Sequence, residues 1–449
     1  MTRPPRRRSN SLQQAVPPAT MPCMAPSASQ AIAADVAVVG GGPAGLMASI
    51  AAAERGRRVV VLEQLDRPGA KLLASGGGRC NLTNTLAPAD FLARFGRQGR
   101  FMQPALEAFG AAALRRWLDS LGVATHAPDG RLVYPVSNSA VTVQSALWRR
   151  AKRLGVAVRL ATRASRLWIE QGVLRGLETT RGRVVAPRVI LASGGRGYPA
   201  LGGSAVGYDL ARQAGHTVTD LVPALVPLLA KEAWVRPCAG VSLPARVWID
   251  LPRSRRARLG RAPYAGAAGD VLFTHRGLSG PVVLDLSGEV SALLAPRETV
   301  PLRLDLSPGT TDAEWLARFD AWERSAGRKT FAVLLDGRLP RRLAATLCGL
   351  AEIAPGAKPS QVSRAARRRL ADLIVALPLT VTATEGWPRA MVTRGGVSLR
   401  EVESRTLASR RLAGLAFAGE ILDLDGPCGG FNLQWAFSSG YLAGRASAE

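Results

Sequence analysis

The sequence predicts an α/β fold: a Rossmann-type domain with a parallel sheet, interrupted by an inserted domain that has a β-barrel-like part and a helical part. Three observations support this prediction. A strand, a glycine-rich turn, a helix and a second strand follow one another from about residue 35. Strand and glycine signals of the same kind return near residue 390. The long segment between them has a different hydrophobic pattern, so we expect both ends of the chain to build one domain.

The first unit has the features of a dinucleotide-binding βαβ motif. Asp35–Val39 is a mainly apolar run of strand length, Gly40–Gly45 follows without a gap, and a second run, Arg58–Leu62, ends on Glu63. The first glycine allows a tight turn, the second lets the main chain approach a pyrophosphate, and the third lets helix and strand pack closely. The helix N-terminus offers N–H groups to phosphates, and Glu63 can accept hydrogen bonds from ribose hydroxyls. An ordinary βαβ unit with a glycine-rich turn is the alternative.

A second glycine loop, Gly69–Asn84, follows the acidic residue directly. Such a loop is not part of a minimal NAD site. It would let the main chain lie against a longer cofactor, with Lys71 and Arg79 free to neutralise phosphate charge. Near the other end, a strand ends at residues 419–420 and a glycine pair at 429–430 opens a helix. This second helix start again places N–H groups at an electron-rich group.

A third strand signal lies between these motifs. Val189–Gly195 is a strand that ends in small residues, and its position matches the third parallel strand of such a domain. Glycine is expected at its end because a β-carbon would collide with the diphosphate of the cofactor. Packing within the protein is the alternative reason for these glycines.

At these motifs the chain resembles the BaiN-like group of bacterial NAD(P)/FAD-dependent oxidoreductases, which are flavoproteins with a Rossmann-type FAD-binding domain and an insert domain. The resemblance covers about residues 35–445, and its most specific stretches are 71–84 and 429–434. It implies non-covalently bound FAD, while members of the group share no one known substrate. Small departures from the pattern of the group lie at Ala70, Cys428 and Phe431.

The motifs and the resemblance together give a set of candidate FAD-binding residues. In flavoproteins of this class the residues near Ala164 lie beside the adenine. We assign no catalytic side chain and no metal ligand from the sequence. The candidates are Gly40, Gly42, Pro43, Ala44, Gly45, Glu63, Gln64, Lys71, Leu72, Ser75, Gly76, Gly77, Arg79, Cys80, Asn81, Ala164, Ala192, Ser193, Gly194, Gly195, Gly419, Glu420, Asp423, Gly430, Phe431, Asn432 and Leu433.

The expected domain boundaries follow from changes in the pattern. Residues 35–204 and 389–449 are assigned to the FAD-binding domain, and residues 205–388 to the insert. The β part of the insert, about 218–308, has short alternating runs, and its helical part, about 311–376, has apolar residues at helical spacing.

Composition limits the partners and the compartment. The net charge of +26 raises nucleic acid as a partner, but the arginines are scattered and no aromatic-interleaved basic stripe occurs, so we expect no specific nucleic acid. Residues 1–34 form a basic tail for which we expect disorder. Five widely spaced cysteines predict a reducing, cytoplasmic setting, without a zinc site. No apolar stretch is long enough to cross a membrane.

The main functional hypothesis is an FAD-dependent oxidoreductase acting on a small organic molecule, with the insert as lid and substrate wall. The chain has a single G-x-G-x-x-G fingerprint, so NAD(P)H would bind transiently, or oxygen or another acceptor would reoxidise the flavin. The alternatives are an FAD-dependent RNA-modifying enzyme and a non-catalytic, flavin-bound redox sensor. Cys80 and Cys428 would form a redox disulfide only with α-carbons within about 7 Å; packing is the alternative role for both.

Overall fold

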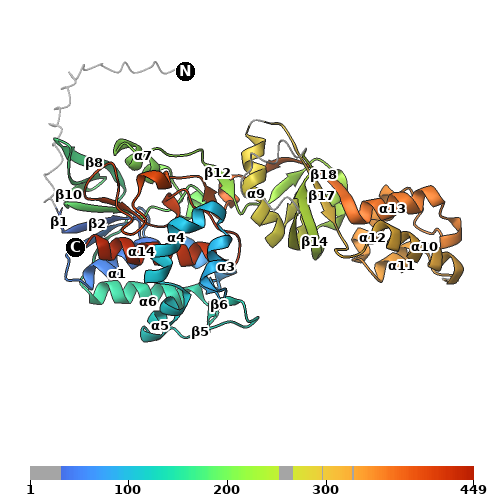
Figure 1. Ribbon diagram of the computed structural model, residues 1–449, viewed down its shortest axis with the longest axis horizontal. Helices are drawn as coiled ribbons and strands as arrows, with labels where there is room; N and C mark the ends of the chain where they lie inside the picture. Colours follow the sequence, from blue (N-terminus) through green and yellow to red (C-terminus); the bar gives the residue numbers. More distant parts are fainter. Residues whose placement is uncertain (1–31, 252–265, 296, 326–327) are drawn as a thin grey trace, which may run out of the picture.

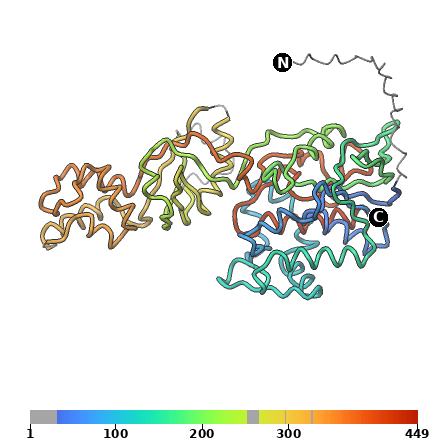
Figure 2. The backbone as a smooth tube through the Cα atoms, turned by 180° about the vertical axis from the view of Figure 1, so that it is seen from behind, coloured from blue at the N-terminus to red at the C-terminus, as the bar shows by residue number. Residues whose placement is uncertain are grey.

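Two bodies follow one another along an elongated molecule, an α/β body and a barrel, and a group of helices continues beyond the barrel (Figure 1). The computed structural model describes residues 32–251, 266–295, 297–325 and 328–449. The predicted fold class is confirmed, because a parallel sheet and a closed β-barrel are both present. The C-terminus lies at the end of the α/β body that is farthest from the barrel (Figure 2).

The α/β body is built on a five-stranded parallel sheet. Val39 at the end of one strand pairs with Leu62 and Leu191 on its two sides, so three strands end in register. β2, β3 and β20 are continuous buried apolar runs, and β11 is one after its first residue, as expected for a parallel sheet covered on both faces; the edge strand β7 is more exposed. In sheet order they are β20 (Leu415–Phe417), β11 (Arg188–Leu191), β2 (Val36–Val39), β3 (Val59–Leu62) and β7 (Ala157–Arg159).

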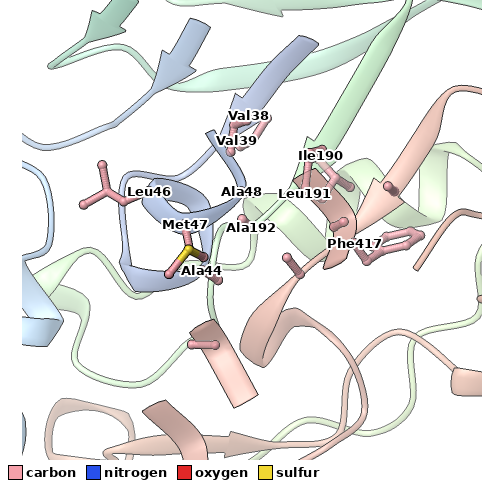
Figure 3. Packing of buried hydrophobic residues seen from close by; sticks show 14 of the residues in the cluster. Val38, Val39, Ala44, Leu46, Met47, Ala48, Ile190, Leu191, Ala192 and Phe417 are labelled. Atoms are coloured by element: carbon pink, nitrogen blue, oxygen red, sulfur yellow. The ribbon is translucent and has the colours of Figure 1, made fainter. Parts of the chain in front are cut away.

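Two long helices pack on this sheet and on each other. α1 (Pro43–Ala53) follows β2, and α14 (Phe431–Ala446) follows the last glycine pair of the chain. Side chains of α1 lie beside those of β2 and β11 in the core (Figure 3). An added Cβ at Gly440 would lie 2.3 Å from the carbonyl oxygen of Ala44, and one at Gly444 would lie 2.2 Å from that of Ala48. The two backbones therefore touch, and only glycine fits at these two positions.

Smaller elements complete the body. A four-stranded sheet has the order β1 (Ile32–Ala33), β10 (Gly182–Val185), β9 (Val173–Thr179), β8 (Ala164–Glu170), and a three-stranded sheet the order β4 (Thr83–Asn84), β6 (Leu132–Pro135), β5 (Thr125–His126). The other helices are α2 (Ala70–Ala74), α3 (Pro88–Ala93), α4 (Gly99–Ala108), α5 (Ala111–Ser120), α6 (Ala140–Arg153) and α7 (Val206–Gln213).

The predicted end of the N-terminal tail is corrected by the first of these strands. Ile32 and Ala33 pair with Val184 and Val185, so ordered structure starts before residue 35. The pairing provides hydrogen-bond partners for the backbone of this short segment at the edge of the sheet. The rest of the predicted tail, residues 1–31, lies outside the described residues.

The insert contains a closed six-stranded barrel whose neighbouring strands are antiparallel. A helix, α9 (Pro281–Leu294), lies within the segment that was predicted as the β part of the insert, and it packs between the barrel and the body (Figure 1). Residues on all sides of α9 are buried, so its sequence lacks the amphipathic spacing by which a helix can be recognised. The strands in barrel order are β13 (Leu228–Ala230), β16 (Gly277–Ser279), β15 (Ala267–Phe273), β14 (Ser242–Ile249), β17 (Val300–Asp305) and β18 (Leu377–Thr384).

Four helices extend the insert away from the body (Figures 1 and 2). They occupy the segment predicted to be helical, and their side chains share one hydrophobic core with the barrel. No helix in the described part of the chain is long and apolar enough to span a membrane. The four helices are α10 (Asp312–Ser325), α11 (Phe331–Asp336), α12 (Arg341–Leu350) and α13 (Arg364–Ala376).

Two neighbouring strands connect the body to the insert. β12 (Val222–Ala224) leads toward the barrel and β19 (Val392–Arg394) leads back, and they pair antiparallel. Next to them the Arg394 guanidinium binds Glu289 of α9 at 3.0 Å and Asp425 of the body at 3.2 Å. This buried ion triad fixes how α9 sits on the body.

The hydrophobic cores support a later start for the insert than the predicted residue 205. Tyr208, Leu210 and Ala211 of α7 belong to the core of the body, and the barrel core begins at Leu228. We therefore propose that the insert begins and ends at the paired strands β12 and β19.

The contact between α1 and α14 gives a stability prediction. Gly440→Ala should lower the free energy of unfolding by about 1–3 kcal/mol, because the new methyl group overpacks the backbone of α1. Gly349→Ala in α12 is the matched control. Among the described atoms, none lies within 4 Å of its added Cβ, and it should stabilise by about 0.5–1 kcal/mol. Urea unfolding at saturating FAD measures both; equal effects would contradict the close helix contact.

Candidate functional site

A cavity of about 470 Å³ lies at the carboxyl ends of the parallel strands. Crevices at this edge of an open α/β sheet are where such folds bind ligands. Many of the predicted cofactor-binding residues line the cavity together: Gly40, Gly42, Pro43, Ala44, Glu63, Gln64, Lys71, Leu72, Ser75, Gly76, Gly77, Asn81, Ala164, Ala192, Ser193, Gly194, Gly195, Glu420, Gly430, Asn432 and Leu433.

The three glycines of the turn after β2 differ in the atoms that an added Cβ would meet. At Gly40, with φ of +104°, an added Cβ would lie 2.5 Å from the carbonyl oxygen of Ala192 on the neighbouring strand. At Gly45 it would lie 1.8 Å from the oxygen of Gly40, so helix and turn touch. At Gly42 no described atom lies within 4 Å of the added Cβ. The protein's own packing therefore does not require glycine at 42, which instead leaves room beside the N-terminus of α1.

Glu63 stands at the end of β3, next to that turn. Its Oε2 accepts a hydrogen bond from Gly41 N–H at 2.8 Å, and its Oε1 accepts one from Leu65 N–H at 2.8 Å. Burial raises the pKa of this carboxyl, while the backbone hydrogen bonds oppose that rise. Each oxygen keeps a further lone pair, so the fixed carboxylate can accept hydroxyl donors from a ligand.

The second glycine loop passes under the cavity, but its two cations do not have the predicted arrangement. Lys71 on α2 pairs with Glu420 at 3.3 Å, so its charge is compensated by a carboxylate. Arg79 is exposed and lies over the ring of Tyr134, 5.0 Å from its centroid, outside the cavity lining. Gly76 and Gly77 have left-handed backbone conformations in this loop, with φ of +57° and +66°.

Two glycines, Gly194 and Gly195, follow the end of β11, and they have separate roles. Gly194 has φ of +71° and no described atom within 4 Å of an added Cβ. A Cβ at Gly195 would lie 2.3 Å from both Glu420 Oε1 and Thr393 Oγ1. Thr393 and Glu420 are also joined to each other, since Thr393 N–H donates a hydrogen bond to Glu420 Oε1 at 2.9 Å. Packing within the protein therefore already requires glycine at 195.

The predicted helix after Gly430 is confirmed, and α14 begins at Phe431. Gly430 has φ of +83° and touches the backbone of Thr83. Oriented to satisfy its neighbours, the Asn81 side chain accepts from Gly430 N–H at 3.2 Å and donates to Thr83 O at 3.1 Å. The first amides of α14 have no partner within the helix, so its N-terminus offers donors to the cavity.

The remaining candidates lie outside the cavity lining and, apart from the exposed Arg79, among the body's own contacts. The Phe431 ring packs 4.7 Å from that of Phe91, and Gly419 O accepts from Trp435 Nε1 at 3.1 Å. Burial raises the pKa of Cys80 to about 12, and both Cys80 and Cys428 are free thiols. The candidates outside the lining are Gly45, Arg79, Cys80, Gly419, Asp423 and Phe431.

Sequence reasoning missed the side of the cavity that faces the insert. Leu225, Met391 and Val392 line it there, next to the paired strands β12 and β19, and Cys428 joins them from the body. Leu225 and Met391 form this wall at the two ends of the insert, and no described residue from 226 to 390 lines the cavity, so the predicted lid is not seen. The insert docks through α9 instead of covering the strand ends. Leu225 has φ of +48° without being glycine, and no sequence pattern marks it.

Two helix N-termini point at this one cavity. α1 and α14 run parallel, since Gly440 meets Ala44 and Gly444 meets Ala48. Gly440 is nine residues after Phe431, whereas Ala44 is one residue after Pro43, so α14 starts about 12 Å ahead of α1 at 1.5 Å per residue. The cavity therefore carries two regions of positive helix-end potential, staggered along its length.

The fold and this site define a Rossmann-type nucleotide-binding protein. The chain belongs to the family of HI0933-like proteins with a Rossmann domain, whose family model matches residues 34–446. It is therefore an FAD-dependent oxidoreductase.

The chain is similar in sequence to two relatives of known activity and in fold to one solved structure. It is 35% identical to a 3-dehydro-bile acid delta(4,6)-reductase of Clostridium scindens, over 92% of this chain and 99% of that one. It is 31% identical to a ribosomal RNA dihydrouridine synthase of Escherichia coli, over 92% of this chain and 97% of that one. The fold is similar to that of a Rhodococcus jostii 3-ketosteroid-delta4-(5alpha)-dehydrogenase, with a TM-score of 0.50 and 16% identity over 95% of this chain and 99% of that one.

The cavity fits FAD. The space beside Gly42 and the N-terminus of α1 suits a diphosphate, and the Glu63 carboxylate suits the hydroxyls of a ribose. The second helix end suits the electron-rich edge of a flavin ring. We propose that the lining candidates hold the cofactor in this direction.

The open space at Gly42 gives a binding prediction. Gly42→Val should weaken FAD binding about 100-fold, or by about 2.7 kcal/mol, because its side chain occupies the room for the diphosphate. Its backbone, with φ of −74°, accepts any residue, so the fold should persist. Gly356→Val is the control, since among described atoms none lies within 4 Å of its added Cβ. Flavin fluorescence titration measures both; normal affinity in Gly42→Val would place the diphosphate elsewhere.

Proposed function

We propose that this protein uses FAD to reduce a carbon–carbon double bond that is conjugated to a carbonyl group in a small organic molecule. The two relatives support this reaction, because a delta(4,6)-reductase and a dihydrouridine synthase both saturate such bonds. Bound FAD supplies the hydride chemistry. What this chain supplies is a shaped cavity with an apolar side for the substrate.

The observation that carries the proposal is the apolar corner of the cavity at the junction of body and insert. Leu225 and Val392 line the cavity there, Leu284 of α9 completes a small hydrophobic cluster with them, and Cys428 packs against this cluster. Ligand sites often lie at domain interfaces, where apolar walls surround a few polar groups. A flat hydrocarbon next to a carbonyl group suits such a corner better than a charged polymer.

The small molecule is favoured over RNA by the distribution of charge. Many arginines are already engaged in ion pairs, among them Arg150 with Glu54, Arg303 with Asp250 and Arg411 with Glu401. Others stack on aromatic rings, as Arg196 does on Trp387. Polyanion binding needs cations that converge on one face. We further propose that NAD(P)H binds transiently as the reductant and that the protein works in the cytoplasm.

An anaerobic reoxidation assay tests the proposal. FAD-loaded protein, reduced with dithionite, is mixed with steroidal enones, simple cyclic enones or ribosomal RNA, and flavin absorbance is followed. We expect enones to restore the oxidised spectrum at a rate that rises with their concentration, and the product mass to rise by two hydrogens. Gly356→Val should behave as wild type.

Three other outcomes would each favour a different function. Reoxidation by ribosomal RNA but by no enone would establish the RNA-modifying alternative. A flavin that stays reduced with every acceptor would favour the redox sensor. Rapid reoxidation in a parallel run to which only air is admitted would favour an oxidase.

A further inference from the structure

Cys428 and Asp285 meet beside the cavity, across the junction between the body and the insert. Cys428 lines the cavity from the loop that precedes α14, and its N–H donates to Asp285 Oδ1 at 2.7 Å. Asp285 belongs to α9 of the insert. The pair therefore exists only when the insert is docked on the body.

The loop holds the thiol in a fixed place. Two residues before it, Gly426 exchanges two hydrogen bonds with the Asn432 side chain, each 2.8 Å long. One residue after it, Gly429 O accepts from Asn84 Nδ2 at 2.9 Å. Because the loop is anchored on both sides of Cys428, the residue that carries the thiol is held in place for a reaction in the cavity.

The environment keeps the thiol protonated. Burial first, and then the charge and hydrogen bond of Asp285, raise the pKa of Cys428 well above its usual range. Burial also raises the pKa of Asp285, opposed by its hydrogen bonds with Cys428 and the charge of Arg94. One turn along α9, Glu289 is paired with Arg394. At neutral pH the cavity thus holds an S–H group beside its apolar corner.

We propose that Cys428 is the proton donor of the reaction and that Asp285 is its positioning residue. This inference rests on the proposed function, the reduction of a conjugated double bond. One alkene carbon accepts a hydride from reduced FAD, and the carbon next to the carbonyl takes the proton of Cys428. The S–H bond breaks, a C–H bond forms, and the thiolate is reprotonated from water. A thiol is a stronger acid than the C–H group it creates, so the transfer is favourable.

The first test measures the ionisation of the Cys428 thiol and needs no catalytic turnover. Iodoacetamide labelling of the FAD-loaded enzyme, mapped by mass spectrometry across pH, reports the thiolate form of Cys428. We expect Cys428 to be labelled slowly at neutral pH and faster as pH rises. Asp285→Asn should move this profile to lower pH, because it removes the negative charge that disfavours the thiolate. Cys348→Ala in α12 should leave the profile unchanged.

The second test separates proton transfer from electron transfer. Reoxidation of reduced Cys428→Ala by a cyclic enone should slow about 100-fold, as for loss of a general acid. Its reoxidation by ferricyanide, which needs no proton on carbon, should match wild type. Cys428→Ser keeps a proton-bearing atom and should fall between wild type and alanine. FAD content and the thermal midpoint show that each variant is folded.

Different outcomes would contradict the proton-donor role of Cys428 and the proposed reduction of a conjugated double bond. The inference is overturned if Cys428→Ala reduces enones at the wild-type rate, if Asp285→Asn leaves the labelling profile in place, or if bound FAD blocks labelling altogether. A wild-type enzyme that no enone reoxidises overturns the proposed function, and the proton-donor role falls with it.

Discussion

The close contact between the backbones of α1 and α14 is the constraint on which the site depends. Gly440 and Gly444 allow this contact, and Gly45 brings the first turn of α1 equally close to the glycine turn. A larger residue at any of these positions would push a helix outward by part of an ångström or more, and close-packed interiors do not absorb such shifts. Because both helices begin at the cavity, their spacing sets where two electron-rich groups of one ligand can bind.

The second structural requirement is the docking of the insert. Two strands cross the junction side by side, and Arg394 joins α9 to the body through two buried carboxylates. A buried ion triad contributes little net stability, but its geometry is demanding, because an unpaired charge there is costly. It therefore fixes the position of α9, and with it Asp285 beside Cys428. The insert acts on the cavity through this contact and not as a cover.

Sequence reasoning found the parts of the site that depend on local geometry. The glycine turn, Glu63 and the start of α14 are each specified within a few residues, because φ angles and helix ends are local properties. It did not find the partners of long side chains. Lys71 pairs with Glu420, 349 positions away, and no local pattern carries that information. The same holds for Leu225, Val392 and Asp285, which meet only through the tertiary docking of two domains.

The most direct measurement of the account is the electron density of FAD in a crystal structure of the holoenzyme. We expect the diphosphate beside Gly42 at the N-terminus of α1, the ribose hydroxyls on Glu63, and the flavin ring at the N-terminus of α14, near Cys428. A flavin in the reverse direction, with its ring beside Glu63 and its adenine beside Cys428, would contradict it.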